Sequence, residues 1–325
     1  MKRKDFILFV IFVFILILLL LLSCGPKKKY APVSSAVRRN RLGPNGVTGG
    51  TNTNGVTVGS QGGTGAGGSQ GGTGAVGSQG GTGAVDNEQI LKQKEIKDIK
   101  IPDKVSQILK TRDNENWDED AAGYNLKGAN QLFSRVKYKV ASGDEFLYND
   151  ATDDKRAKES KALRREFYLA CEYNANFIKA FAGVVNKLVA TDELAAKNKA
   201  ELEQFVENVR FYALFYYNAY SILKEKQSKL DVLTLKKLQS LKTAFLLLEK
   251  EQQELYDVIQ LIINDYNNDT SINSSEPTHN LKSIDTLPSE IIEYWKKDTL
   301  RGDFNRKCGN IINTAIMILN LLKDI

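Results

Sequence analysis

The stretch "ELEQFVENVRFYALFYYNAYSILKEK", residues 201–226, indicates the fold of this 325-residue chain. Its apolar residues are separated alternately by three and four positions, which places them on one face of a helix. The residues on that face are Leu202, Phe205, Val209, Tyr212, Tyr216, Ala219 and Leu223. The spacing predicts a long helix that packs against other helices along its length.

The same alternation recurs in three other stretches, residues 163–188, 238–266 and 304–322. Only Asn174 and Gln252 are strongly polar at these otherwise apolar positions. Each of them either fixes the register between helices or faces a gap or water.

Shorter helices are expected before these stretches. Asp86 is a candidate N-cap for a helix over 87–100, which Pro102 would end. Two more helices are expected over 103–112 and 124–141.

Breaks between the long helices are expected at Thr191-Asp192, around 228–233 and across the polar segment 267–288. No segment alternates with a period of two over a useful length, so no strand is expected. Residues 87–325 are therefore predicted to form an all-α domain, a bundle of long antiparallel helices.

A spacer precedes this domain. Residues 24–86 are rich in Gly, Ser and Thr, and the octapeptide Gly-Ser-Gln-Gly-Gly-Thr-Gly-Ala occurs at 59–66, 68–75 and 77–84. Such a composition buries too little apolar surface to offset chain entropy, so a disordered tether is expected. The G-x-G-x-x-G match at 63–68 lies within the repeats, without the strand and helix that a dinucleotide site needs.

The first residues look like an export signal. A positively charged start is followed by an apolar run from Phe6 to Leu22 and then by Ser23 and Cys24. Leu-Leu-Ser-Cys at 21–24 resembles the lipobox of bacterial lipoproteins, which implies that residues 1–23 are a signal peptide and that Cys24 is lipidated. The alternative is an uncleaved transmembrane anchor, because about 17–25 apolar residues can cross a bilayer.

The basic charge of the chain is concentrated near its start. Residues 1–86 hold nine of the 45 Lys and Arg and two of the 39 Asp and Glu, so 36 basic and 37 acidic residues remain in 87–325. The nearly neutral domain gives no reason to expect a nucleic-acid partner. The basic residues behind Cys24 are expected to contact anionic head groups of a membrane.

The most aromatic part of the chain, residues 210–220, suggests a first candidate site. Tyr217 and Tyr220 widen the apolar stripe of their helix. They are either buried between several neighbouring helices or belong to a partly exposed patch that anchors a partner protein.

Arg301-Gly302-Asp303 suggests a second candidate site, because it spells a tripeptide that resembles integrin ligands. The favoured interpretation is local: Gly302 breaks a helix and Asp303 caps the next one. Exposure in a turn would support the receptor-binding alternative.

The sequence offers little for catalysis or metal binding. The single histidine, His279, argues against histidine-based catalysis. Cys171 and Cys308 are expected to be buried free thiols, with a disulfide between them as the alternative. Acidic residues cluster at 118–120 and at 150–154 without the spacing of an EF-hand, and they are interpreted as solvated loop charge. We therefore expect no cofactor, no metal and no enzymatic activity.

The charged leader, the Leu-Leu-Ser-Cys motif at 21–24, the polar tether and the helical domain together resemble the outer-surface lipoproteins of Borrelia-type spirochaetes. Members of that group are non-enzymatic, surface-displayed and antigenic, and many bind host complement regulators, plasminogen or matrix components. The resemblance implies a lipoprotein of the outer membrane that faces the cell exterior and binds a host serum or matrix protein in adhesion or immune evasion.

Two alternatives to host binding remain. One is a subsurface envelope lipoprotein with a structural or assembly role. The other is an enzyme or small-ligand carrier, which needs an internal pocket that the helix faces do not indicate. The apolar faces could also form a homodimer.

Overall fold

The computed structural model describes residues 82–323 and 325, with side chains from residue 87 onward, and all of them belong to one compact unit. The predicted signal peptide, Cys24 and the tether up to residue 81 lie outside the described residues. The helices are α2 (Thr82–Asp98), α3 (Asp103–Asp113), α4 (Asp154–Ala170), α5 (Ala175–Val185), α6 (Asp192–Lys226), α7 (Leu235–Asn267), α8 (Pro288–Trp295) and α9 (Asp303–Lys323). The all-α prediction is confirmed.

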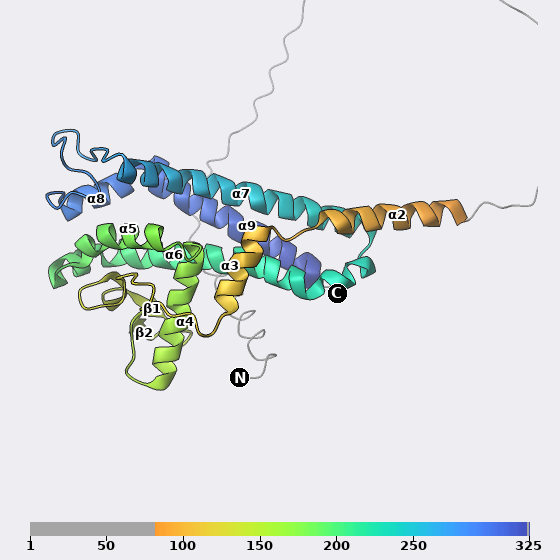
Figure 1. Cartoon of the computed structure of the whole chain (residues 1–325), viewed down its shortest axis with the longest axis horizontal. Helices are drawn as coiled ribbons and strands as arrows, with labels where there is room; N and C mark the ends of the chain where they lie inside the picture. Colours follow the sequence, from red (N-terminus) through yellow and green to blue (C-terminus); the bar gives the residue numbers. More distant parts are fainter. Residues whose placement is uncertain (1–81, 324) are drawn as a thin grey trace, which may run out of the picture. The chain divides into compact units, whose positions relative to one another are not determined.

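The long helices α6, α7 and α9 form the centre of the unit (Figure 1). Tyr220 of α6 contacts Phe245 of α7 with 5.0 Å between ring centroids, and Tyr216 donates to Glu249 at 2.8 Å. Residue numbers thus rise along α6 as they fall along α7, so the two helices are antiparallel. The Thr234 hydroxyl starts α7 by accepting from the Lys237 N–H at 3.3 Å.

Helix α9 packs along both α6 and α7. Asn208 of α6 bonds Asn305 at 3.0 Å, and Lys226 at the end of α6 donates to the Leu322 carbonyl at 2.7 Å. Helix α9 therefore runs parallel to α6 and antiparallel to α7, and Lys307 pairs with Glu254 of α7. The apolar faces predicted from the spacing meet here, because Leu223, Leu248 and Ile311 are fully buried.

The single helix predicted over 163–188 is wrong, because the chain turns between α4 and α5. Glu172 and Tyr173 have φ angles of 53° and 56°, in the left-handed region that ends a right-handed helix. Asn174 then caps α5, with its side chain accepting from the Phe177 N–H at 3.1 Å. The polar residue on the apolar face thus starts a helix and does not set a register between helices.

The helix predicted over 124–141 is also wrong. Asn125 and Asn130 have positive φ angles, and they are followed by the short 3-10 helix η1 (Leu132–Ser134). The strands β1 (Lys137–Lys139) and β2 (Glu145–Leu147) then pair antiparallel. Gly143 supplies the turn with a φ of 91°, which only glycine adopts easily.

Short helical turns link the long helices. They are η2 (Asn186–Val189), η3 (Gln227–Val232) and the π-turn η4 (Asp298–Gly302). The breaks expected at Thr191 and around 228–233 are confirmed, since Thr191 caps α6 and η3 separates α6 from α7. The first described helix starts at Thr82, before the predicted N-cap at Asp86.

Candidate functional site

The predicted aromatic patch is not exposed. Tyr217 and Tyr220 are 2% and 1% exposed, so of the two alternatives burial between neighbouring helices is confirmed and the partly exposed patch is wrong. Tyr220 contacts Phe245 of α7, and its hydroxyl shares the carboxylate of Glu249 with Tyr216. The stripe is wide because α4 and α9 both pack against α6. Burial raises the pKa of both tyrosines far above the ordinary value.

The Arg301-Gly302-Asp303 tripeptide lies in helical backbone at the junction of η4 and α9. Asp303 is the first residue of α9 and has helical dihedral angles, so the prediction that it is the N-cap is wrong. Arg301 bonds Glu201 at 3.1 Å and Asp303 accepts from Arg306 at 2.7 Å. Residues two apart on a helix do not face each other, so this geometry does not present the two charges to one receptor site.

Both cysteines of the described residues are free and buried, as expected. Burial raises the pKa of the Cys171 thiol and of the Cys308 thiol well above the ordinary range. Neither residue is therefore poised as a nucleophile.

The acidic cluster at 118–120 is only partly solvated. Glu119 is 5% exposed, and the prediction of loop charge is wrong for it. Arg164 of α4 is also buried and donates from Nε to the two Glu119 oxygens at 3.0 and 2.9 Å. It donates from a terminal nitrogen to the Tyr148 carbonyl at 2.5 Å. Asp153, in the second cluster, caps α4 by accepting from the Arg156 N–H at 2.8 Å.

A second buried arginine extends this network into α6. Arg210 donates to Glu166 at 2.6 Å and to the Tyr148 hydroxyl at 2.7 Å. Tyr148 thus joins the two arginines, one through its carbonyl and one through its hydroxyl. Every charge in this cluster has a partner, so it holds α4 against α6 and leaves no free group for chemistry.

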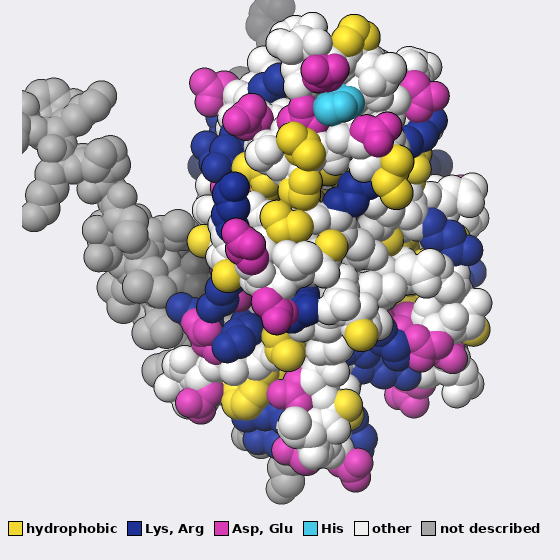
Figure 2. Space-filling view, turned by 90° about the vertical axis from the view of Figure 1, so that its left-hand side faces the viewer, with side chains coloured by type: hydrophobic (Ala, Val, Ile, Leu, Met, Phe, Trp, Pro, Cys, Tyr) yellow, Lys and Arg dark blue, Asp and Glu magenta, His cyan; other side chains and the backbone are white. Residues whose placement is uncertain are grey.

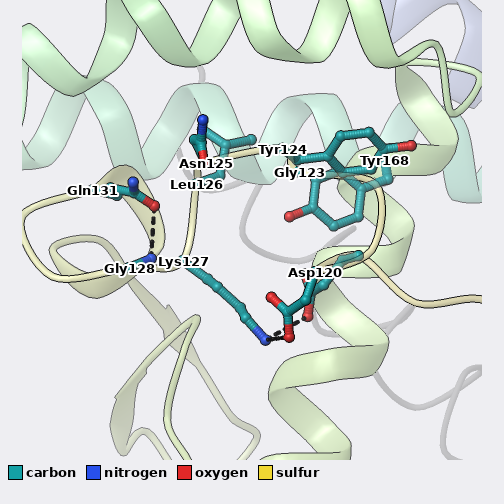
Figure 3. Close-up of a pocket in the computed structure, with 10 residues that line it drawn as sticks. Asp120, Gly123, Tyr124, Asn125, Leu126, Lys127, Gly128, Gln131 and Tyr168 are labelled. Carbon is teal, nitrogen blue, oxygen red and sulfur yellow. Dashed lines mark hydrogen bonds and ion pairs between the residues drawn. The ribbon is translucent and has the colours of Figure 1, made fainter.

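Figure 3 shows a small polar pocket beside this network, with a volume of about 220 Å³. Lys127 reaches across it to Asp120 at 2.5 Å, and the Gly128 N–H donates to the Gln131 side chain at 2.7 Å. Since its own side chains satisfy these polar groups, the pocket is a weak candidate for a ligand site.

A larger cleft of about 790 Å³ lies between α5 on one side and α7 and α8 on the other. Its walls are Phe177, Phe181 and Val184 from α5 and Ile259, Ile262, Ile263 and Tyr266 from α7. Phe205, Trp295 and Phe304 also line it, with Phe205 5.3 Å from Trp295 and 5.5 Å from Phe304 between ring centroids.

The cleft was not predicted from the sequence. The spacing assigns Phe177, Phe181 and Ile262 to apolar helix faces, but these side chains are only half-buried. The periodicity shows which face of a helix is apolar and does not show whether another helix covers it.

The described residues contain no group of three or more His, Cys, Asp or Glu side chains that could hold a metal ion. Among the same residues, no helix combines the length and the hydropathy needed to cross a bilayer.

Comparisons with known proteins place the chain in a family. A family model described as "Borrelia Bbcrasp-1 domain containing protein" matches residues 126–323. A search of curated proteins finds no match.

Two solved structures are similar to the chain. One is a C-terminal proteolytic fragment of an outer surface protein from Borrelia burgdorferi, with 15% identity and a TM-score of 0.47. The other is the outer surface protein BBA66 from Borrelia burgdorferi, with 14% identity and a TM-score of 0.47. Each alignment covers 71% of this chain and 99% of the other. The family model covers more than half of the sequence, and the chain belongs to the Borrelia Bbcrasp-1 domain family.

Proposed function

We propose that this protein is a lipid-anchored surface protein whose helical unit binds a host protein, in adhesion or immune evasion. The observation that carries the proposal is the family match over 126–323, which spans most of the described helices. It agrees with the resemblance of this chain to spirochaetal outer-surface lipoproteins. On this proposal Cys24 carries the lipid, and the Gly-rich segment spaces the helical unit from the membrane.

The α7–α8 loop is the part of the unit that we propose for the host contact. Ile284 in this loop is 92% exposed, and Leu287 at the start of α8 is 55% exposed. Binding residues lie preferentially on loops held by a rigid scaffold, and an exposed aliphatic pair suits the apolar centre of an interface.

A pull-down from host serum and matrix extract tests this proposal. The bait is the chain from Gly25 onward, and residues 25–81 alone are the control for the tether. We expect a saturable partner that the full bait retains and the tether does not. Ile284→Ser should weaken its capture, whereas Val232→Ser, at a site 70% exposed in η3, should leave it unchanged.

The anchor and the display need their own tests. Palmitate labelling of cells that express the chain should be lost in Cys24→Ala, and protease added to intact cells should cut the helical unit. A protected unit that crosslinks to envelope proteins would favour the alternative, a subsurface protein with a structural role.

A further inference from the structure

The positive charge of the helical unit is concentrated in the connection between α6 and α7. Residues 224–237 contain five lysines and two acidic residues, a net charge of +3. Of the 36 basic and 37 acidic residues in 87–325, 31 basic and 35 acidic residues lie outside this connection, a net charge of −4. A unit with such an uneven charge turns its basic part toward an anionic surface.

Several helix ends meet at this connection. Lys92 of α2 donates to the Asp231 carbonyl of η3 at 2.7 Å, and Lys226 at the end of α6 donates to the Leu322 carbonyl of α9. The α7–α8 loop lies beyond the other end of α7, about 50 Å away along this helix of 33 residues (Figure 1). We call residues 224–237 together with the neighbouring part of α2 the basic end.

Three lysines of the basic end are available for contacts. Lys224, Lys229 and Lys236 are exposed, and their ammonium groups have no ion pair or hydrogen bond among the described residues. Free ammonium groups near an anionic bilayer are attracted to the phosphates of the lipid head groups.

Exposed apolar side chains lie at the same end. Val232 of η3 is 70% exposed and stands in the sequence between Lys229 and Lys236. In α2, Ile90 is 65% and Leu91 is 48% exposed. Apolar side chains beside lysines suit the interface of a bilayer, where the apolar groups reach the acyl chains and the ammonium groups stay among the head groups.

The part of the chain that carries the predicted lipid is joined to this end. Lys92 contacts η3, and Glu95 pairs with Lys242 of α7 at 3.0 Å, so residue numbers rise in the same direction along α2 and α7. Thr82 therefore lies on the side of η3 that faces away from α8. A lipid on Cys24, as proposed above, anchors the unit by this end, which selects a membrane among anionic surfaces.

The opposite end has a different surface. Figure 2 shows Asp and Glu side chains around the only histidine of the chain, which lies in the α7–α8 loop. Glu276 and Asp285 of this loop are exposed and have no ion pair among the described residues. An anionic membrane repels such a surface.

We propose that the basic end docks on a membrane surface that contains anionic lipid, with Val232 at the boundary of the acyl chains and Lys224, Lys229 and Lys236 at the phosphates. The choice of a membrane rests on the proposed lipid anchor, and the host contact plays no part in the docking. The docked unit presents the α7–α8 loop at the far end of α7, away from the membrane.

Quenching by brominated lipid tests which end meets the membrane. In the unlipidated chain from Gly25 onward, Val232→Trp places a tryptophan at the basic end, and Ile284→Trp, at a site 92% exposed, places one in the α7–α8 loop as the control. With vesicles of dibrominated phosphatidylglycerol, we expect the fluorescence added by Val232→Trp to be quenched and that added by Ile284→Trp to be unchanged.

Two double variants test the lysines by partition into phosphatidylglycerol vesicles at low ionic strength. Lys229→Gln with Lys236→Gln should weaken partition about 25-fold, because each lysine near an anionic surface contributes about fivefold. The matched control, Lys158→Gln with Lys161→Gln at exposed positions of α4, removes the same charge and should weaken partition less than about twofold. All variants keep the basic residues that precede the unit, so the contribution of those residues cancels.

Circular dichroism confirms that each variant is folded. Quenching of both added tryptophans or of neither overturns the proposal, and so do equal losses in the two double variants. Equal partition into phosphatidylcholine and phosphatidylglycerol vesicles overturns the contact through charge. The assays contain no host protein, so a failure of docking leaves the proposed host contact standing, and an empty pull-down leaves the docking standing.

Discussion

The buried pair of Glu119 and Arg164 makes a strong prediction about stability. Glu119→Gln keeps the shape of the side chain and one oxygen acceptor but removes the negative charge. Arg164 then stays charged at 6% exposure, with the Tyr148 carbonyl and an amide oxygen as its acceptors. Lys127, whose Nζ lies 3.7 Å from Glu119 Oε1, adds a second positive charge nearby.

The size of the effect follows from burial. Removing one partner of a buried ion pair costs about 3–5 kcal/mol, because the remaining charge has been taken out of water without compensation. Since glutamine keeps one acceptor, we expect the lower end of that range, about 3 kcal/mol. With a denaturant dependence of about 2 kcal/mol per molar urea, the unfolding midpoint should fall by about 1.5 M.

Urea unfolding of the chain from Gly25 onward, followed by circular dichroism, measures this shift. Asp120→Asn is the matched control, because Asp120 is the next residue, also pairs with Lys127, and has a side chain that is 63% exposed. An exposed pair contributes about 0–1 kcal/mol, so the control should shift the midpoint by less than about 0.5 M.

A double variant isolates the pair from the loss of packing. Glu119→Leu alone and Arg164→Met alone should each destabilise the chain more than the two together, since apolar replacement of both partners removes the unpaired charge. Equal midpoint shifts for Glu119→Gln and Asp120→Asn, or fully additive losses in the double variant, would refute the reasoning.

Three further predictions concern other parts of the unit. The Glu290 carboxylate, 2.9 Å from His279 Nδ1, raises the pKa of His279 above its ordinary value of 6.5. The pairing therefore stabilises the α7–α8 loop fully below pH 6.5, and this stabilisation is lost as the pH rises through the raised pKa. A proton NMR titration of this single histidine should show the raised pKa, and an unchanged value in Glu290→Gln would contradict the assignment. Cys171 and Cys308 should react with a thiol reagent such as Ellman's reagent only after unfolding, because both are buried and free; fast labelling of the native chain would show that the helices around them open. Asn174→Ala removes the cap of α5 and should cost about 1 kcal/mol in urea unfolding, whereas no loss would mean that the capping bond contributes nothing.

The three central helices could be predicted from the sequence because their apolar residues keep a regular spacing over many turns. In α6 and α7 the regularly spaced residues Leu223 and Leu248 are fully buried, as the pattern predicts. Helix α9 shows the same regularity through Ile311 and Ile318, both fully buried. Regular spacing over a long stretch is therefore a reliable signal of a packed helix in this chain.

The same spacing misled the prediction at the turn between α4 and α5. Phe167 and Phe177 continue the pattern across the turn because the apolar faces of both helices point toward the same core. The turn itself is made by Glu172 and Tyr173 in the left-handed region, and neither is the glycine or proline that usually marks a break. The burial of Glu119 was hidden for another reason: its partner lies 45 residues away, and a single sequence does not show which charges meet.

The cleft exists because the apolar face of α7 is longer than the helix that covers it. The apolar face of α7 was assigned through Tyr266, and this assignment requires a neighbouring helix along the whole face. Helix α9 begins opposite residue 258, so about two and a half helical turns of α7 extend beyond it. Helices α5 and α8 flank this extension but leave Ile262 and Phe181 half-buried, with a cleft between them. Where an apolar helix face extends beyond the helix that covers it, apolar surface stays in contact with water. Covering this surface is favourable for the same reason that packs the central helices together, the burial of apolar area.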